Sequence, residues 1–177
     1  PWDDDIDVMM LRKDYQKFSD LYAKSESKYD LLTYKNTTHY NNPFMKMSDK
    51  STILIEDRLS KVNIGANIDI FPIDNIPQKN QSFFYTKLKC YRQLLKLKTY
   101  ECKFEKRFLR KLMLICGRFS VFFLPVKWIL KKLDNLTQKD YKNSHLSGVT
   151  VWGYFEKEIC RSEVFSDSIL VEFEGKS

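Results

Sequence analysis

Residues 1–10 read PWDDDIDVMM, and the alternation that begins at Asp5 decides the fold we expect. Successive side chains of a β-strand point to opposite faces, so Asp5 and Asp7 would lie on one face and the apolar residues beside them on the other. Beyond this run, apolar residues recur at helical spacing while lysine and arginine occupy the other helix faces. The sequence therefore predicts a strand over residues 6–10 and an amphipathic helix directly after it.

Other short segments also have the composition and alternation of strands. They are residues 29–35, 52–57, 66–71 and 169–173. In the third of these, Asp69 stands between apolar neighbours and would share a face with Asn67 and Phe71. We expect Pro72 and Pro77 to bracket the exit of this strand, because proline cannot donate a ladder hydrogen bond.

A lysine-rich stretch over about residues 79–141 shows apolar residues at helical intervals. Gly117 and Pro125 would break it, so we expect a helical insert of at least two helices with a bend between them. Only five glycines and five prolines occur in the chain, which leaves no room for a flexible linker. The prediction is a single α+β domain over residues 1–177, with a mixed β-sheet core and flanking helices.

Charge and cysteine usage narrow the class of protein. A net charge of +7 suits nucleic acid, anionic lipid or phosphorylated substrates without choosing among them. The four cysteines form no CxxC pair, which argues against a zinc site. The acidic start is not a signal peptide, so we expect reduced thiols and a cytoplasmic location. Because the chain starts with Pro1 and stops at Ser177 after a strand-like run, we expect it to be a piece of a longer protein, truncated at both ends.

Two aspartates separated by one apolar residue on a strand can hold a hard divalent cation, because Mg²⁺ and Mn²⁺ prefer carboxylate and phosphate oxygens. A third carboxylate from another strand would complete such a site, and Asp69 is the best candidate, with Asp74 as the fallback. A solvated acidic edge over residues 3–7 is the alternative, since crowded like charges need water. The residues alone leave both interpretations open.

Two motifs resemble those of the LicD family: residues 1–8, PWDDDIDV, and residues 68–77, IDIFPIDNIP. Members of that family adopt the nucleotidyltransferase fold and are related to fukutin. They are typified by bacterial enzymes that move phosphocholine from CDP-choline onto cell-surface glycans such as lipopolysaccharide and teichoic acid. The resemblance therefore implies a transferase of this fold.

The resemblance also implies roles for individual residues. Asp5 and Asp7 would be the metal-binding pair and Asp69 the third carboxylate, and all three would be catalytic residues that bind Mg²⁺ or Mn²⁺. Residues in supporting positions would be Asp3, Asp4 and Asp74. Residues that could reach donor phosphates are Lys46, Thr52 and Arg58. A Gly-containing segment that grips the nucleotide phosphates is expected before Pro1.

The expected activity is metal-dependent transfer of a phospho-alcohol, with CDP-choline as donor and a glycan hydroxyl as acceptor. Transfer of ribitol phosphate or another phospho-sugar, and an inactive truncated member, remain open alternatives. A basic nucleic-acid-binding protein is a further alternative, but the acidic cluster would repel phosphate, so no nucleic acid is expected. Ring faces for a choline group are offered by Trp2, Trp152, Tyr154 and Phe155, but ordinary packing is the better explanation for each, so the sequence assigns none of them to choline binding.

The basic segment from Lys87 to Lys132 is too charged to span a bilayer. Two interpretations stay open for it. One is a solvated helix face whose apolar side joins the core. The other is peripheral attachment to the inner face of a membrane, which would suit an acceptor glycan built on a lipid carrier.

Overall fold

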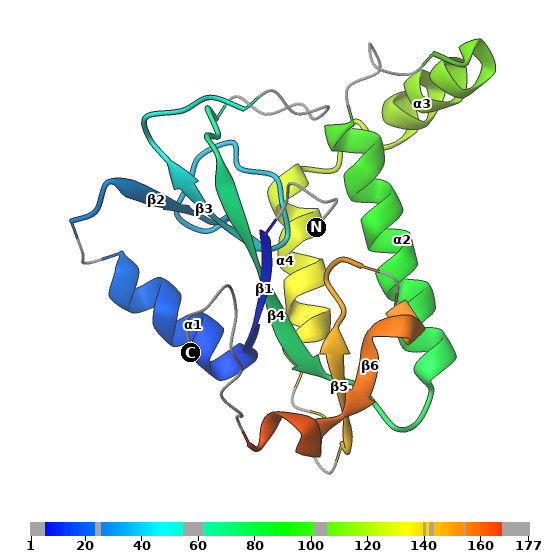
Figure 1. Ribbon diagram of the computed structural model, residues 1–177. Helices are drawn as coiled ribbons and strands as arrows, with labels where there is room; N and C mark the ends of the chain where they lie inside the picture. The colour runs from blue at the N-terminus through cyan, green and yellow to red at the C-terminus, as the bar shows by residue number, and fades with distance from the viewer. Residues whose placement is uncertain are drawn as a thin grey trace.

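A computed structural model describes residues 6–23, 26–54, 62–100, 106–139, 141, 144–153 and 155–167 (Figure 1). Its strands are β1 (Ile6–Leu11), β2 (Tyr29–Leu32), β3 (Met45–Asp49), β4 (Asn67–Asn75), β5 (Leu146–Val149) and β6 (Ile159–Arg161). Its α-helices are α1 (Arg12–Tyr22), α2 (Gln81–Thr99), α3 (Phe108–Ser120) and α4 (Val126–Thr137). Two short 3-10 helices, Phe155–Glu158 and Ser162–Phe165, flank β6. The α+β class is confirmed.

The strands form one mixed sheet in which β4 is the central element. β1 pairs with β4 in parallel, whereas β3 and β5 pair with it in antiparallel orientation. Ile73 pairs with both Leu11 and Val149, so β1 and β5 lie on opposite edges of β4. The outer strands β2 and β6 complete the sheet by pairing with β3 and β5. Each of the other described strands therefore pairs with β4 directly or is separated from it by one strand.

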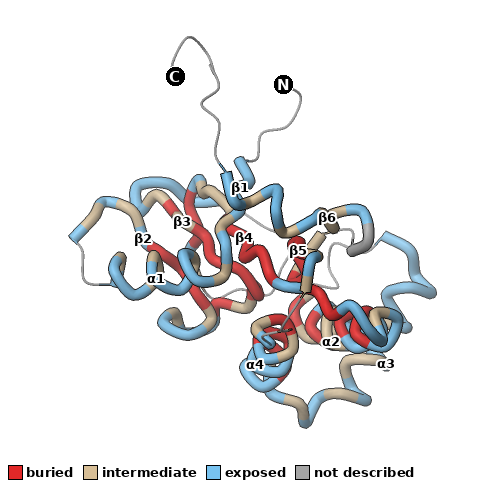
Figure 2. The backbone as a smooth tube through the Cα atoms, turned by 90° about the horizontal axis from the view of Figure 1, so that it is seen from below, coloured by how far each residue is buried: buried red, intermediate tan, exposed pale blue. Residues whose placement is uncertain are grey.

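The two faces of the sheet have different neighbours. Ile68 and Ile70 of β4 pack with Tyr15 and Phe18 of α1, which covers the face carrying the even-numbered residues of β4. On the other face, Phe71 packs with aromatic and β-branched side chains near β5. Figure 2 shows the buried residues along β3, β4 and β5 and on the inner turns of α2 and α4. Helix α1 thus does not cover the face that carries the odd-numbered residues of β1 and β4.

The predicted strand over residues 6–10 and the helix after it are confirmed as β1 and α1. The strand predicted over 66–71 is longer than expected, because β4 continues through Pro72 to Asn75. Pairing with β3 ends at Ile70 and pairing with β5 begins at Ile73. Pro72 lies in the gap between these two partners, where a missing N–H is tolerated on that edge.

Two other strand predictions were not confirmed. The segment over 52–57 contributes an isolated bridge between Leu54 and Ile64, and residues 55–57 lie outside the described part. The strands β3, β5 and β6 were not predicted, and they are short, with five, four and three residues. The strand predicted over 169–173 lies outside the described residues.

The lysine-rich stretch forms three helices, α2 to α4, in agreement with the expectation of at least two. Pro125 does separate α3 from α4. Gly117, however, does not break a helix, and that prediction was wrong: it lies within α3, where a Cβ atom would come within 3.0 Å of Leu97 Cδ2. Its role is close packing of α3 on α2 rather than termination of a helix.

Candidate active site

Three of the expected site residues form one row across the sheet. In the parallel register Asp7 of β1 is the partner of Asp69 of β4, and in the antiparallel register Asp69 is the partner of Lys46 of β3. Residues directly opposite each other on adjacent strands point to the same face. Asp7, Asp69 and Lys46 therefore lie side by side on the odd-numbered face of β4.

Lys46 balances the charge of this row. Its Nζ lies 2.7 Å from Asp69 Oδ1 and donates a hydrogen bond of 2.8 Å to Asn67 Oδ1. The lysine residue is 6% exposed, whereas 20% of the Asp69 side chain is accessible and Asp7 lies at the exposed strand β1. The carboxylate row is thus buried at its lysine end and open to solvent at Asp7. This difference in solvent exposure lets a ligand approach the aspartates from the β1 side.

A groove of about 640 Å³ opens beside Asp7 on the same face. Its apolar floor contains Phe71 and Ile73 of β4 together with Val149 of β5. Apolar floors of this kind bind the uncharged parts of small ligands, while a few polar groups fix their orientation. Here Asp7 provides one such group at the end of the groove.

The far wall of the groove carries Trp152 and two opposite charges. Arg92 of α2 lies over the Trp152 ring, with its guanidinium carbon 5.3 Å from the ring centroid, and donates a hydrogen bond of 2.9 Å to the Gly153 carbonyl. Burial lowers the pKa of Arg92, and the nearby Glu158 carboxylate offsets part of this effect. Gly153 has a φ of +83°, and a Cβ there would lie 2.0 Å from Glu158 Oε2. Glycine at this position lets Glu158 approach the backbone closely.

Asp74, the fallback metal ligand, lies on the opposite face of β4 from Asp69. Arg12 at the start of α1 binds it with both ends of the guanidinium group: Nε to Oδ1 and Nη2 to Oδ2, each at 2.6 Å. Thr150 Oγ1 also donates to Asp74 Oδ2 at 3.4 Å. Only 1% of the Asp74 side chain is accessible, and burial raises its pKa despite the charge of Arg12. The structure does not bring Asp74 together with Asp7 and Asp69.

The Arg12 network extends to α4. Arg12 Nη1 lies 3.2 Å from Asp134 Oδ1, and Lys35 Nζ lies 3.2 Å from Asp134 Oδ2, which also accepts the Tyr34 hydroxyl. Burial alone would raise the pKa of Asp134, but the hydrogen bond from Tyr34 and the charges of Arg12 and Lys35 outweigh it and lower the pKa. These contacts tie β4, α1 and α4 together.

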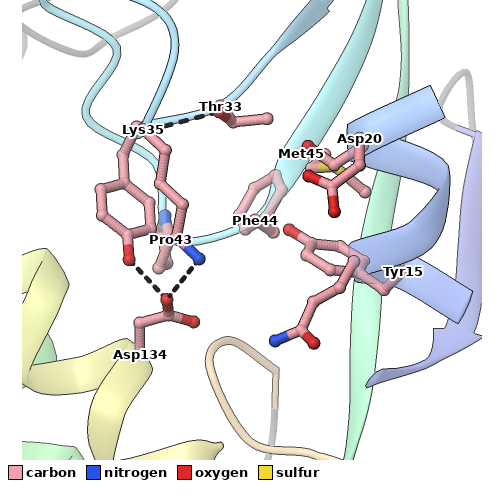
Figure 3. Close-up of a pocket in the computed structure, with 11 residues that line it drawn as sticks. Tyr15, Asp20, Thr33, Lys35, Pro43, Phe44, Met45 and Asp134 are labelled. Atoms are coloured by element: carbon pink, nitrogen blue, oxygen red, sulfur yellow. Dashed lines mark hydrogen bonds and ion pairs between the residues drawn. The ribbon is translucent and has the colours of Figure 1, made fainter. Parts of the chain in front are cut away.

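A second pocket, of about 220 Å³, adjoins this network between α1 and α4 (Figure 3). Tyr15, Asp20 and Asp134 face it from the two helices, and Lys35 reaches Asp134 from the loop after β2. Burial raises the pKa of Tyr15 well above its ordinary value, so its hydroxyl stays protonated. Lys46 and the aspartates Asp7 and Asp69 do not line this pocket.

The remaining expected residues are placed as follows. Thr52 Oγ1 accepts a hydrogen bond of 2.7 Å from the Ala66 N–H and donates one of 3.2 Å to the Asp49 carbonyl, so it fastens the turn after β3 to the start of β4. Residues outside the described part are Asp3, Asp4, Asp5 and Arg58. Among the residues that the structure does describe, no group of three or more His, Cys, Asp and Glu side chains is gathered as a metal site. Of the three aspartates expected as metal ligands, the structure therefore describes Asp7 and Asp69.

Sequence reasoning missed Arg92 and Glu158. Arg92 is one of many basic residues in the helical stretch, and no spacing distinguishes it from the others. Glu158 follows Trp152 by six residues, and the two side chains line the same groove, with Glu158 close to the Gly153 backbone. Gly153 was the available signal, because glycine is the usual residue where another group approaches the backbone closely.

Comparison with known proteins is consistent with this geometry. The family model described as "LicD/FKTN/FKRP, nucleotidyltransferase domain" matches residues 1–125, which include Asp7, Lys46 and Asp69. The lipopolysaccharide cholinephosphotransferase LicD of Haemophilus influenzae is 28% identical over 195 aligned positions, which cover 99% of this chain and 67% of that protein. No solved structure matches the chain significantly.

Proposed function

Because the chain belongs to the LicD/FKTN/FKRP nucleotidyltransferase-domain family, we propose that it is a metal-dependent transferase of phosphocholine from CDP-choline to a glycan hydroxyl. The observation that carries this proposal is the registered pair Asp7 and Asp69, of which Asp7 also lines a groove that contains an arginine, a carboxylate and a tryptophan ring. The similar cholinephosphotransferase supports the choice of the transferred group.

The carboxylate pair fits a hard divalent cation, because its oxygen ligands are of the kind that Mg²⁺ and Mn²⁺ prefer. Asp7 and Asp69 would hold the ion, and Asp5 is proposed as a further ligand. When bound, the ion would neutralise charge on the donor diphosphate and on the departing CMP. Lys46, 2.7 Å from Asp69 Oδ1, keeps the aspartate carboxylate fixed in the row and adds positive charge at its inner end.

Phosphocholine is a zwitterion, and the groove wall carries both complementary charges. Arg92 would pair with the phosphate, since a guanidinium group matches phosphate geometry. The quaternary ammonium cannot donate hydrogen bonds, so it would lie against the Trp152 ring near the Glu158 carboxylate. This arrangement would orient the donor with its diphosphate toward Asp7.

In the transfer step, the acceptor hydroxyl oxygen forms a bond to the choline-bearing phosphorus, and the bond from that phosphorus to the bridging diphosphate oxygen breaks. CMP leaves with the electron pair of the broken bond. A sugar hydroxyl is a poor nucleophile at neutral pH, so a neighbouring base must take its proton. We assign this role to Asp69.

The proposal is tested by release of CMP from CDP-choline in the presence of Mg²⁺ and an acceptor glycan. Asp7→Asn should reduce the rate to background, and Asp69→Asn should reduce kcat by about 10²- to 10⁴-fold. Asp30→Asn is the matched control, because Asp30 is exposed on β2 and pairs only at the surface with Lys50. Full activity of Asp7→Asn would exclude the proposed site.

The same assay separates the choices of donor. CDP-ribitol in place of CDP-choline tests a ribitol-phosphate transferase, which would use the same aspartates but would gain nothing from a ring face beside a carboxylate. We expect CDP-choline to be preferred. A preference for CDP-ribitol would keep the metal pair and overturn the assignment of Trp152 and Glu158 to the choline group.

A further inference from the structure

Helix α3 lies on the protein with its apolar side turned outward. None of its residues is buried, and it extends from the body beyond the end of α2 in Figure 1. Phe108 and Phe119 are each 76% exposed, and Met113 is 73% exposed. A surface helix of a globular protein normally turns such residues toward the core. This helix does the reverse.

The contacts of α3 with α2 explain its orientation. Arg118 donates from Nε to the Leu97 carbonyl at 3.1 Å and from Nη2 to the Tyr100 carbonyl, and Gly117 lies against the Leu97 side chain. The inner side of α3 thus contains a glycine and an arginine. Apolar residues at intervals of four, three and four positions form a stripe on another side of the helix: Phe108, Leu112, Ile115 and Phe119.

The turn after α3 continues the apolar surface. Phe122 and Phe123 are 73% and 68% exposed. Lys98 of α2 donates to the Phe122 carbonyl at 2.9 Å and to the Val121 carbonyl at 3.4 Å, which fixes the backbone of this turn. The two rings are therefore presented by an anchored segment, next to the outward stripe of α3.

The segment that contains this surface carries charge of one sign. Residues 106–132 contain eight lysines and arginines and no aspartate or glutamate. Basic residues beside exposed aromatic and aliphatic side chains are the composition of a helix that lies in a membrane interface. Anionic headgroups attract the basic residues, while the apolar side chains enter the boundary between headgroups and acyl chains.

We propose that α3 and the turn over residues 121–124 dock on the surface of a bilayer that contains anionic lipid. No helix in the described part of the chain has the length and apolarity needed to cross a bilayer, so the contact would be peripheral. α3 has 13 residues, about 20 Å of helix, which suits a segment lying in the membrane plane. This inference does not depend on which group the active site transfers.

Other occupants fit the surface less well. A second copy of the chain would bring the same basic segment, which has no aspartate or glutamate over residues 106–132, and like charges facing each other oppose association. Single-stranded nucleic acid would suit the basic and aromatic residues but would leave the aliphatic side chains Leu109, Leu112 and Ile115 without a partner. An anionic bilayer uses both the charge and the aliphatic surface.

The test is co-sedimentation of the whole protein with vesicles of phosphatidylcholine alone and of phosphatidylcholine with phosphatidylglycerol. We expect binding to the anionic vesicles that weakens with salt. The double variant Phe119→Ser/Phe122→Ser should weaken it by about 100-fold, at about tenfold for each ring removed from the interface. Neither ring is buried, so the variant should keep the melting temperature of the wild type.

Phe83→Ser is the matched control, because Phe83 is 61% exposed but lies on α2, outside the proposed surface. It should bind vesicles like the wild type. Binding that is equal on neutral and anionic vesicles, or unchanged in the double variant, would overturn the proposal. So would a dimer, or a complex with single-stranded DNA, that forms without vesicle binding and is abolished by the double variant. CMP release in detergent solution remains a separate test of the active site.

Discussion

Arg12→Met should cost the protein about 3–5 kcal/mol of unfolding free energy at pH 8, because it breaks a buried ion pair and leaves its partner behind. The wild-type guanidinium makes two 2.6 Å bonds to Asp74, one contact of 3.2 Å to Asp134 and one of 3.2 Å to Thr137. Only 1% of the Asp74 side chain is accessible, so water cannot replace the lost partner. Methionine fills much of the arginine volume, so the cost is mainly electrostatic rather than that of a cavity.

The penalty should shrink as the pH falls. Burial already raises the pKa of Asp74 in the folded wild type, and Arg12 partly opposes this effect. Without Arg12 the folded-state pKa would rise further above the unfolded value. A carboxyl group with a raised folded-state pKa stabilises the fold when protonated, and this contribution is lost as the pH rises through that pKa. Between the unfolded-state pKa and the folded-state pKa of Asp74, the variant should regain about 1.4 kcal/mol of unfolding free energy for each pH unit of acidification.

Urea unfolding of wild type and Arg12→Met at pH 8 and pH 5.5 measures both effects. Lys50→Met is the matched control: it removes a cation 3.1 Å from Asp30, but both side chains are about half exposed, so it should cost less than about 1 kcal/mol. The double variant Arg12→Met/Asp74→Asn should be more stable than Arg12→Met at pH 8, because it removes the unpaired charge. A penalty below about 1 kcal/mol, equal at both pH values and not relieved by Asp74→Asn, would refute the reasoning.

Two further predictions concern the active site. Lys46→Met should tighten Mn²⁺ binding by about tenfold or more, because it removes a positive charge 2.7 Å from Asp69 Oδ1. An unchanged Mn²⁺ affinity, measured by electron paramagnetic resonance, would count against a metal at Asp69. Trp152→Ala should raise the KM for CDP-choline by about 3- to 30-fold and affect kcat less, as expected for a ring that binds a quaternary ammonium. The control is Trp128→Ala, which changes the partly exposed tryptophan of α4. Equal effects of the two variants would exclude that role for Trp152.

The central part of the site could be predicted from the sequence. Strict alternation around Asp7 and around Asp69 fixes the face of each carboxylate relative to its own strand. The parallel register then brings the two residues to directly opposite positions, Asp7 with Asp69. Alternation does not state which strands are neighbours, so the sequence alone could name the pair but could not show that they lie side by side.

The rest depended on contacts that no local pattern encodes. β3 was missed although Met45 to Ser48 alternate between apolar and polar residues, because the strand is short and contains no β-branched or aromatic residue. The buried Lys46 is stabilised by Asp69 and Asn67 of another strand, whose side-chain oxygens interact with its ammonium group. Asp74 was the fallback for the third carboxylate, yet its distance of five residues from Asp69 places it on the other face of the strand.

The odd spacing between Asp69 and Asp74 gives β4 two different tasks. Asp69 lies on the same face of the sheet as the groove, and Asp7 and Lys46 are its neighbours on either side. Asp74 faces the helices, where Arg12 ties it to Asp134 of α4. Arg12 directly follows β1, the strand that carries Asp7, so the network beneath the sheet holds β1 and β4 in the register that pairs the two carboxylates. A substitution at Arg12 should therefore weaken the active site through the position of β1, although no atom of Arg12 lies in the groove.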